Sequence, residues 1–594
     1  MYNLNYPFDS MLILKKRKSI KKELLARDTV YIEKRIALLS GSTIGDVKPV
    51  LELFLLHQGI KPVFYEGWYN RFYEDAVFEN KELAEFQPEI IYIHTSNKNI
   101  NKFARVGDDD ATIQNILLAT CKKFETIWVE LKKQYNCPII QNNFESLSYR
   151  VLGNADIYNK FGKNNFINHL NQMMYEYANN NAGFYINDIN YLAAWFGLEK
   201  WSSSSHWYLY KYAFDLNAIP LLCQSIARIV KSIYGKNKKA LAIDLDNTLW
   251  DGVIGDDGVE NIKLGEESSE GKAFTEFQSY LKDISSLGIM LNVCSKNDEA
   301  IAIEGFTHEA SILKKEDFIA FKVNWIDKST NIKSIANEIN IGTDSIVFVD
   351  DDPVERQIVK TNLPEVSVPE MSRPEDYIKI LDQQGYFEIT MLSADDINRN
   401  QSYKSNVQRE QLAGNVKDYK EFLLSLQMKC YMRKFSEPII PRITQLINKT
   451  NQFNLTTKRF SEDEVRNIAT DDEAITLAAR LCDKFGDNGI VTTMIALIQG
   501  EEAVIDLWVM SCRVFKRNLE FAMFDELVKE CGDAGVNKIK GYYLPTKKNA
   551  LVKELYQDLG FEKVQESETA IVWEYSIPTE YQNKNKVVEV NYVK

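Results

Sequence analysis

Apolar and polar positions alternate along most of the chain in a pattern that predicts parallel sheets joined by crossover helices. Short apolar runs with strand character, such as residues 35–42 and 89–96, are separated by stretches such as 47–59, in which apolar residues recur at helical spacing. Strands that alternate with helices build α/β domains, whose ligands bind beyond the carboxyl ends of the strands. The sequence therefore predicts an α/β multidomain fold that begins with a doubly wound domain.

Changes in this pattern divide the chain into five parts. A basic, glycine-containing segment at 232–240 precedes a second series of strands and helices, which ends after proline-rich residues 362–377. Polar, helix-prone residues follow, and then strand-rich segments with helices expected at 519–535 and 549–560. The predicted parts are a doubly wound domain at 1–232, a Rossmann-like domain at 236–385, a helical connector at 386–427, a mixed α/β domain at 428–580 and a C-terminal tail at 581–594.

Length and charge narrow the functional classes. A chain of 594 residues is too long for one hydrophobic core, which agrees with several domains. Its net charge of -13 makes the surface repel polyanions, so we expect no nucleic-acid partner. We find no secretory signal at the start and no apolar stretch that would span a membrane. Eight scattered cysteines without a CxxC pair fit a reducing compartment, so we expect a cytoplasmic protein.

The segment LAIDLDNTLW carries the strongest chemical signal in the chain. Two carboxylates, Asp244 and Asp246, end an apolar strand, and Thr248 completes a DxDxT motif. At the carboxyl end of a parallel strand, one carboxylate can attack phosphorus while the other transfers a proton. The motif therefore predicts Asp244 as the nucleophile and Asp246 as the acid and base of phosphoryl transfer. We assign Thr248 to substrate binding.

Two later segments supply groups for a phosphoryl oxygen. LNVCSKND is an apolar strand that ends in Ser295, whose hydroxyl can bind phosphate, and it contains Asn297, which we also assign to the substrate. WIDKST supplies Lys328, a positive charge suited to a phosphoryl group in transfer. These residues predict a phosphate pocket at the same edge of the sheet.

A third strand ends in metal ligands. DSIVFVDDDPVER contains Asp350, Asp351 and Asp352, which offer the oxygen atoms that Mg²⁺ prefers. We predict that Asp350 and Asp351 bind Mg²⁺ together with Asp244 and the backbone carbonyl of Asp246.

These motifs, in this order, resemble the haloacid dehalogenase (HAD) superfamily of phosphoryl-transfer enzymes. The resemblance implies a Rossmann-like domain in which Asp244 takes the phosphoryl group with Mg²⁺ as cofactor. The intervals between Thr248 and Ser295 and between Ser295 and Lys328 are too short for a large cap domain, so we expect an open, capless site. The substrate of such a site must be enclosed by a neighbouring domain or presented on a protein.

Longer segments resemble one family within this superfamily. DLDNTLWDGVIGDDG, VCSKND, EDFIAFKVNW and FVDDDPVER, with LINKTNQFNLTTKR and LWVMSCRVFKRNLE further on, are similar to the FkbH-like family (HAD subfamily IIIC) over about residues 236–565. Members of that family turn 1,3-bisphosphoglycerate into a glyceryl thioester on an acyl carrier protein. The resemblance implies a phosphorylated three-carbon acyl donor as substrate and a carrier protein with its phosphopantetheine arm as partner, in polyketide or surface-polysaccharide biosynthesis.

The flanking domains resemble two further folds. The first 230 residues are similar to SGNH hydrolases, and Ser42, Asn97 and His206 match that family's catalytic residues. The acidic residue expected three positions before the histidine is Ser203 here, which predicts a degenerate site without the carboxylate that orients the imidazole. Residues 428–575 resemble GNAT-type acyltransferases, but CRVFKRNLE replaces their glycine-rich pyrophosphate loop, which argues against acetyl-CoA as a ligand.

A cysteine would hold the acyl group if the chemistry of the FkbH-like family applies. Cys294 adjoins Ser295 at the predicted sheet edge, whereas Cys512 lies near the place where GNAT proteins bind pantetheine pyrophosphate. Strand alternation turns the side chain of Cys294 away from that of Ser295, and cysteines are common in cores. Cys294 is the first candidate and Cys512 the second.

Two polar segments of the mixed α/β domain at 428–580, the third domain of the chain, offer groups for the carrier arm. Arg513 and Arg517 can bind the single phosphate of phosphopantetheine, or can be solvated surface charges. Amides and hydroxyls in KTNQFNLTT can hydrogen-bond a hydroxylated acyl group or pantetheine amides, or can cap a helix. The candidates in this segment are Asn451, Gln452, Asn454, Thr456 and Thr457.

The leading hypothesis is an Mg²⁺-dependent enzyme that dephosphorylates the acyl donor and passes the acyl group to a carrier thiol. The alternative is a simple phosphatase or a scaffold, in which the third domain only binds a partner. With the same donor, only the first yields an acylated carrier protein.

Overall fold

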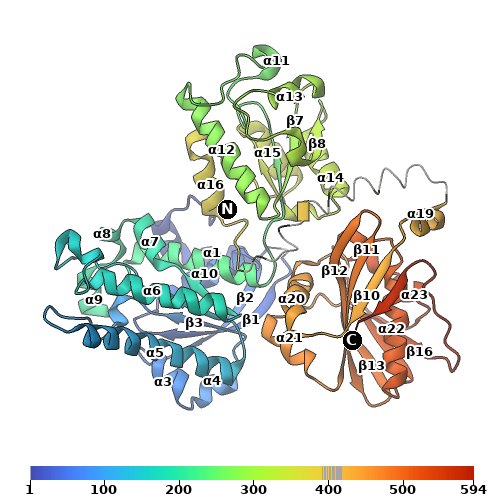
Figure 1. Ribbon diagram of the computed structural model, residues 1–594, viewed down its shortest axis with the longest axis horizontal. Helices are drawn as coiled ribbons and strands as arrows, with labels where there is room; N and C mark the ends of the chain where they lie inside the picture. Colours follow the sequence, from blue (N-terminus) through green and yellow to red (C-terminus); the bar gives the residue numbers. More distant parts are fainter. Residues whose placement is uncertain are drawn as a thin grey trace. The chain divides into compact units, whose positions relative to one another are not determined.

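The computed structural model describes residues 2–27, 29–390, 392, 397, 399–400, 403, 409, 418–546 and 548–593. Most of the connector predicted at 386–427 lies outside the described residues, although helix α19 (Tyr419–Ser425) falls within its last part. Contacts divide the chain into two compact units, residues 1–234 with 461–464, and residues 235–460 with 465–594 (Figure 1). Within the described ranges, no helix combines the length and apolar character needed to cross a membrane.

A parallel sheet of five strands forms the middle of the first unit. The strands are β1 (Ile32–Ser40), β2 (Ile60–Glu66), β3 (Ile90–His94), β4 (Ile139–Asn142) and β5 (Phe184–Asn187), in the order β2-β1-β3-β4-β5. The helices are α1 (Ser10–Leu25), α2 (Val47–His57), α3 (Phe72–Val77), α4 (Lys81–Phe86), α5 (Asp110–Tyr135), α6 (Lys163–Asn180), α7 (Ile189–Phe196), α8 (Leu198–Trp201), α9 (Ser204–Tyr210) and α10 (Ile219–Ile233).

Alternating residues of β1 explain why helices cover both faces of this sheet. Ile36 and Leu38 pack against α1, α2 and α10, whereas Ala37 and Leu39 pack on the other face, against α3, α5 and α6. The predicted doubly wound fold is confirmed.

The second parallel sheet belongs to the second unit and has the order β8-β7-β6-β9. Its strands are β6 (Ala240–Ile243), β7 (Met290–Ser295), β8 (Phe318–Val323) and β9 (Ile346–Val349), and its helices are α11 (Ile254–Asp257), α12 (Ser269–Ser286), α13 (Glu299–Gly305), α14 (Lys328–Glu338), α15 (Pro353–Asn362) and α16 (Tyr377–Gln384). Leu241 and Ile243 pack toward α12, whereas Ala240 and Ala242 pack toward α14 and α15. This confirms the Rossmann-like prediction.

Both intervals in which a cap domain would be inserted are fully described and short. Residues 244–268, between β6 and α12, contain the single-turn helix α11, and residues 324–327 join β8 to α14. The predicted capless architecture is therefore confirmed, and the carboxyl end of the sheet carries no inserted domain.

A mixed sheet of eight strands forms the rest of the second unit, in the order β15-β16-β14-β13-β12-β11-β10-β17. Its strands are β10 (Lys429–Arg433), β11 (Ala474–Asp483), β12 (Gly486–Gln499), β13 (Glu502–Met510), β14 (Lys538–Tyr543), β15 (Glu562–Glu566), β16 (Ile571–Ser576) and β17 (Glu589–Tyr592). The accompanying helices are α20 (Ile440–Lys449), α21 (Glu462–Ala469), α22 (Leu519–Asp533) and α23 (Leu555–Asp558). The mixed α/β prediction is confirmed.

The end of the chain differs from the prediction. Residues 581–594 were predicted as a tail, but β17 pairs in parallel with β10, and Val588 is buried in the domain core. Asp525 fixes the approach to this strand, because its carboxylate accepts hydrogen bonds from the backbone N–H groups of Lys584 and Asn585. The helix expected at 549–560 is also shorter, since only α23 is α-helical there.

Candidate active site

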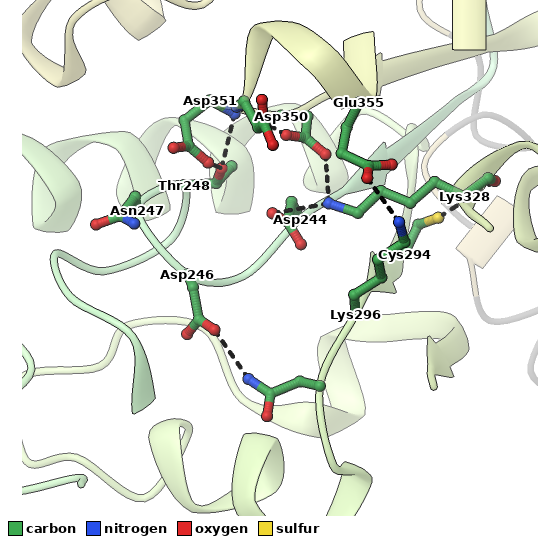
Figure 2. Close-up of polar contacts among 12 residues, drawn as sticks. Asp244, Asp246, Asn247, Thr248, Cys294, Lys296, Lys328, Asp350, Asp351 and Glu355 are labelled. Carbon is green, nitrogen blue, oxygen red and sulfur yellow. Dashed lines mark hydrogen bonds and ion pairs between the residues drawn. The ribbon is translucent and has the colours of Figure 1, made fainter. Parts of the chain in front are cut away.

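Three strand ends of the second parallel sheet bring the predicted catalytic residues together. Strand β6 ends at Ile243, so Asp244 lies at the start of the following loop and not on the strand as predicted. Since β6 and β9 are paired in parallel, Asp244 and Asp350 follow neighbouring residues of the two strands. The Lys328 ammonium lies between them, 3.0 Å from Asp244 Oδ2 and 2.5 Å from Asp350 Oδ2 (Figure 2).

The charges of this cluster are nearly shielded from water. Lys328 is 3% exposed and Asp350 is fully buried. Burial opposes the positive charge of Lys328, but Asp244 and Asp350 outweigh this effect and raise its pKa. Burial, reinforced by the charge of Asp244, raises the pKa of Asp350 to about 7 and also raises that of Asp351. The site therefore carries more negative charge than one lysine balances.

The carboxylates fit a divalent cation. One oxygen from each of Asp244, Asp350 and Asp351 lies within 4.8 Å of the other two. Asp244 Oδ1 is buried and has no hydrogen-bond partner among the described residues. A buried carboxylate oxygen without a partner is costly, and hard cations such as Mg²⁺ take carboxylate ligands. These three residues would hold the predicted Mg²⁺.

Asp246 is oriented by groups outside this cluster. Its Oδ1 accepts hydrogen bonds from Trp250 Nε1 at 2.9 Å and from the backbone N–H of Ile254 at 3.1 Å, and its Oδ2 accepts one from Asn297 Nδ2 at 2.9 Å. Burial raises the pKa of this carboxyl. The turn is possible because Asn247 adopts a φ of 53°, a conformation that asparagine tolerates. Asn297, predicted to bind substrate, instead holds Asp246.

Several neighbouring residues position the metal ligands. Thr248 Oγ1 donates to Asp351 Oδ1 at 3.1 Å, and Thr248 is completely buried. The hydroxyl is therefore held by the ligand loop, which does not support its predicted role as a substrate contact. Arg356, which the sequence reasoning missed, donates to the backbone carbonyls of Asp350 and Asp351. Asp352 caps α15 by accepting a hydrogen bond from the N–H of Val354.

A cavity of about 460 Å³ opens at this cluster. Ser295 lines it, as predicted, and so do two charged residues that the sequence reasoning missed, Lys296 and Glu355, which form an ion pair at 2.6 Å (Figure 2). Both lie within segments already singled out, VCSKND and FVDDDPVER, and the turn from each strand into the next helix was the available signal. The lining residues are Asp244, Asp246, Asn247, Ser295, Lys296, Lys328, Asp351, Asp352, Pro353 and Glu355.

Cys294 lies outside this cavity. Its side chain is fully buried on the face that packs against α14 and α15, and its thiol lies 3.7 Å from the carbonyl oxygen of Lys328. Burial raises the pKa of the thiol well above its usual range. A thiol in this environment is a poor nucleophile, so the position does not support Cys294 as the acyl-bearing residue.

The polar segment of the third domain is part of the sheet and not an open binding surface. Strands β13 and β14 pair only between Glu502–Ile505 and Lys538–Gly541, although both continue further. Residues 453–455 lie between the diverging ends: the N–H of Met510 donates to Phe453 O, and the N–H of Leu544 donates to Leu455 O. The segment fills this gap in the sheet.

Individual side chains of that segment are used internally. Asn454 is 1% exposed and accepts a hydrogen bond from the N–H of Thr457, Thr456 donates to the carbonyl of Asp506, and Asn451 accepts from Arg459. Asn451, Asn454 and Thr456 therefore have structural partners, which does not support their predicted role in substrate binding. For Gln452 and the side chain of Thr457 that prediction stays untested.

The predicted phosphate ligands of the third domain are also engaged. Arg517 is 7% exposed and pairs with the buried Asp483 at 3.0 Å, so it is not a solvated charge, and its phosphate role is not supported. Arg513 Nε donates to Ser511 Oγ. Cys512 is half-buried, and its sulfur lies 3.5 Å from the Tyr403 hydroxyl.

In the first unit, a hydrogen bond joins the segments that carry two of the predicted SGNH residues, Ser42 and His206. Thr43 Oγ1 donates to the carbonyl of Tyr210, which brings α9 beside the loop that contains Ser42. Ser42 Oγ and Asn97 Oδ1 are buried, and no partner is found for either in the described ranges. His206 does have a neighbouring carboxylate, Asp215, with Nδ1 and Oδ2 3.7 Å apart. At this distance no hydrogen bond orients the ring, and His206 Nδ1 has no hydrogen-bond partner among the described residues, so the expectation of a degenerate site stays a prediction.

Replacing Asp351 with alanine should weaken Mg²⁺ binding while leaving the fold intact, because the side chain lies at a strand end and not in the apolar core. Isothermal titration of the variant with Mg²⁺ measures the loss, and its melting curve without metal checks the fold. Unchanged Mg²⁺ affinity would transfer the ligand role to Asp350 or Asp352.

Comparisons with known proteins agree with this geometry. A model of the FkbH N-terminal domain matches residues 55–231. The N-terminal part of the protein BF1531 from Bacteroides fragilis, whose crystal structure contains a phosphatase domain complexed with Mg, is 28% identical, with a TM-score of 0.58. That match covers 63% of this chain and 99% of the other. No curated protein sequence matches the chain.

Weaker likenesses concern solved structures of acetyltransferases. The ribosomal-protein-S18-alanine N-acetyltransferase from Escherichia coli is 15% identical over 26% of this chain and 99% of its own, with a TM-score of 0.21. A GNAT-family acetyltransferase from Streptococcus pneumoniae is 15% identical over 25% of this chain and all of its own, also with a TM-score of 0.21. Scores this low support no functional assignment. The chain thus combines a segment that matches the FkbH N-terminal domain, a HAD-like phosphatase domain similar to that of BF1531, and a C-terminal domain built on a mixed sheet.

Proposed function

We propose that this chain dephosphorylates a phosphorylated three-carbon acyl donor, similar to 1,3-bisphosphoglycerate, and transfers the glyceryl group to an acyl carrier protein. The grouping of Asp244, Asp350 and Asp351 around Lys328 at an open sheet edge carries the phosphoryl-transfer part. The acyl-transfer part rests on the resemblance of residues 236–565 to FkbH-like proteins, supported by the matching FkbH N-terminal domain. That resemblance implies a place in polyketide or surface-polysaccharide biosynthesis.

The phosphoryl step follows from the positions of the side chains. Asp244 attacks phosphorus in line, while Lys328 and Ser295 bind phosphoryl oxygens. Bound Mg²⁺ would neutralise the charge on the same oxygens. Asp246, held by Trp250 and Asn297, protonates the leaving oxygen and then accepts a proton from the water that hydrolyses the phosphoenzyme.

The acyl step requires a different nucleophile, because a thiolate attacks a carbonyl carbon much better than a carboxylate does. The carrier thiolate attacks the acyl carbon of the donor, and the phosphate bound to that carbon leaves as the C–S bond forms. The two phosphates of the donor therefore depart by different routes. One leaves from carbon, and the ester phosphate is transferred to Asp244.

Incubation with Mg²⁺, 1,3-bisphosphoglycerate and a holo-carrier protein tests the whole proposal. We expect release of both phosphates together with a carrier whose intact mass has increased by one glyceryl group. With the Asp244→Asn variant, the ester phosphate should not be released and no glyceryl-loaded carrier should form. Phosphate release without any acylated carrier would leave a simple phosphatase, the second candidate function, which the burial of Cys294 favours.

A covalent acyl intermediate on the chain itself can be located by two cysteine variants. Cys294→Ala should retain phosphate release, because the sulfur lies outside the cavity and its loss should cost only ~1 kcal/mol in packing. Any three-carbon adduct seen by intact-protein mass spectrometry should persist in Cys294→Ala and disappear in Cys512→Ala. The reverse pattern would return the acyl site to Cys294.

A further inference from the structure

The two lysines of the cavity differ in exposure and in partners. Lys328 is buried and is engaged by two of the carboxylates at the predicted metal site. The Lys296 side chain is 35% exposed, and its one ion-pair partner among the described residues is Glu355, whose side chain is 13% exposed. These two residues come from the turn after β7 and from the first turn of α15, so the pair lies at the sheet edge beside the phosphoryl site (Figure 2).

The cavity is larger than a phosphoryl group requires. Its volume of about 460 Å³ falls in the range of roughly 300–1,000 Å³ that is usual for whole small molecules. The remainder of a small substrate must therefore meet the lining beyond Lys328 and Ser295. Apart from the two lysines, the charged lining residues are all carboxylates: Asp244, Asp246, Asp351, Asp352 and Glu355.

This distribution of charge leaves one place for a second anionic group. Apart from the two lysines, every charged group that lines the cavity is a carboxylate, and like charges at close range repel. Beside Lys296, a second anionic group would meet an ammonium group and could replace Glu355 as its partner. A lysine held by a single, partly exposed carboxylate is easily exchanged, because such pairs contribute little stability.

We propose that Lys296 binds a second anionic group of the substrate, a carboxylate or a phosphate on the same small molecule as the transferred phosphoryl group, and that Glu355 holds the lysine when no such group is present. This inference rests on the proposed function and sharpens it. The ester phosphate is then removed from the free, doubly anionic donor, and not from a thioester on the carrier, whose acyl carbon carries no anionic group.

Two stable substrates that differ in one group test the inference. 3-Phosphoglycerate and glycerol 3-phosphate have the same length, but only the first has a carboxylate. With Mg²⁺, we expect kcat/KM to favour 3-phosphoglycerate, and Lys296→Met to reduce that preference at least about tenfold, the factor that ~1.4 kcal/mol corresponds to. Glu355→Gln should act in the opposite direction and lower KM for 3-phosphoglycerate, because the competing carboxylate is gone.

The matched control is Lys322→Met. Lys322 forms an ion pair of the same length, 2.6 Å, with Glu338 and has similar exposure, but neither residue lines the cavity. The Lys322→Met variant should hydrolyse 3-phosphoglycerate and glycerol 3-phosphate at the rates of the wild type. An unchanged preference in Lys296→Met, or a higher KM in Glu355→Gln, would overturn the inference while leaving the proposed function intact. Failure of the wild type to hydrolyse either compound, with p-nitrophenyl phosphate still cleaved, would overturn the donor class and the inference together.

Discussion

Asp244→Asn should abolish release of the ester phosphate, with a loss of at least about 10⁴-fold in kcat, a magnitude typical of removing a covalent nucleophile. The amide has nearly the same shape as the carboxylate and can still accept a hydrogen bond from Lys328, but it cannot form an acyl phosphate. Because a negative charge is removed from a cluster in which three carboxylates share one lysine, the variant should not be destabilised in the absence of metal.

A phosphate-release assay with Mg²⁺ checks the loss of activity, and a melting curve without Mg²⁺ checks that the variant is not destabilised. Residual activity within about tenfold of wild type would exclude Asp244 as the nucleophile, since such a loss amounts to only ~1.4 kcal/mol of transition-state stabilisation. Asp351→Ala provides the comparison, because it removes a carboxylate from the same cluster but leaves the nucleophile.

Lys328→Met is expected to impair both chemistry and stability. Loss of its charge should reduce kcat by roughly 10²–10³-fold, as for other fixed groups that stabilise charge in a transition state. The variant also leaves Asp244 and Asp350 without their common partner at a site where Asp350 is fully buried. Breaking a buried pair in this way costs about 3–5 kcal/mol.

The same variant should respond more strongly to metal than the wild type does. The ammonium and Mg²⁺ both compensate the carboxylates, so adding Mg²⁺ should recover part of the lost melting temperature. Differential scanning calorimetry with and without Mg²⁺ measures this recovery. A melting temperature equal to that of the wild type without metal would show that the lysine does not balance these carboxylates.

The sequence was most informative where chemistry depends on strand ends. An apolar strand followed by Asp244, another by Asp350 and Asp351, and a third that ends in Ser295 predict a common site, because carboxyl ends of parallel strands meet at one edge. The alternation of apolar residues likewise predicted helices on both faces of the first two sheets. These inferences need only local pattern and the geometry of parallel sheets.

Inference failed where a side chain's role depends on a partner distant in sequence. Thr248 contacts Asp351, and Asp215 is the carboxylate within ion-pair distance of the His206 ring. No rule of sequence spacing indicates either pair. The polar segment that contains Asn454 suggested ligand groups, but it lies between two diverging strands. Strand β17 was missed for the same reason, since its neighbour β10 is remote in the chain.

The most direct test of the account is to identify the residue that becomes phosphorylated. Protein mixed with Mg²⁺ and a phosphorylated substrate can be quenched during turnover and treated with borohydride, which reduces an aspartyl phosphate to an alcohol and so marks the residue. Mass spectrometry of the peptide that contains LAIDLDNTLW should then find the mark on Asp244 in the wild type and none in Asp244→Asn. A mark on another residue, or phosphate release without any marked residue, would contradict the account.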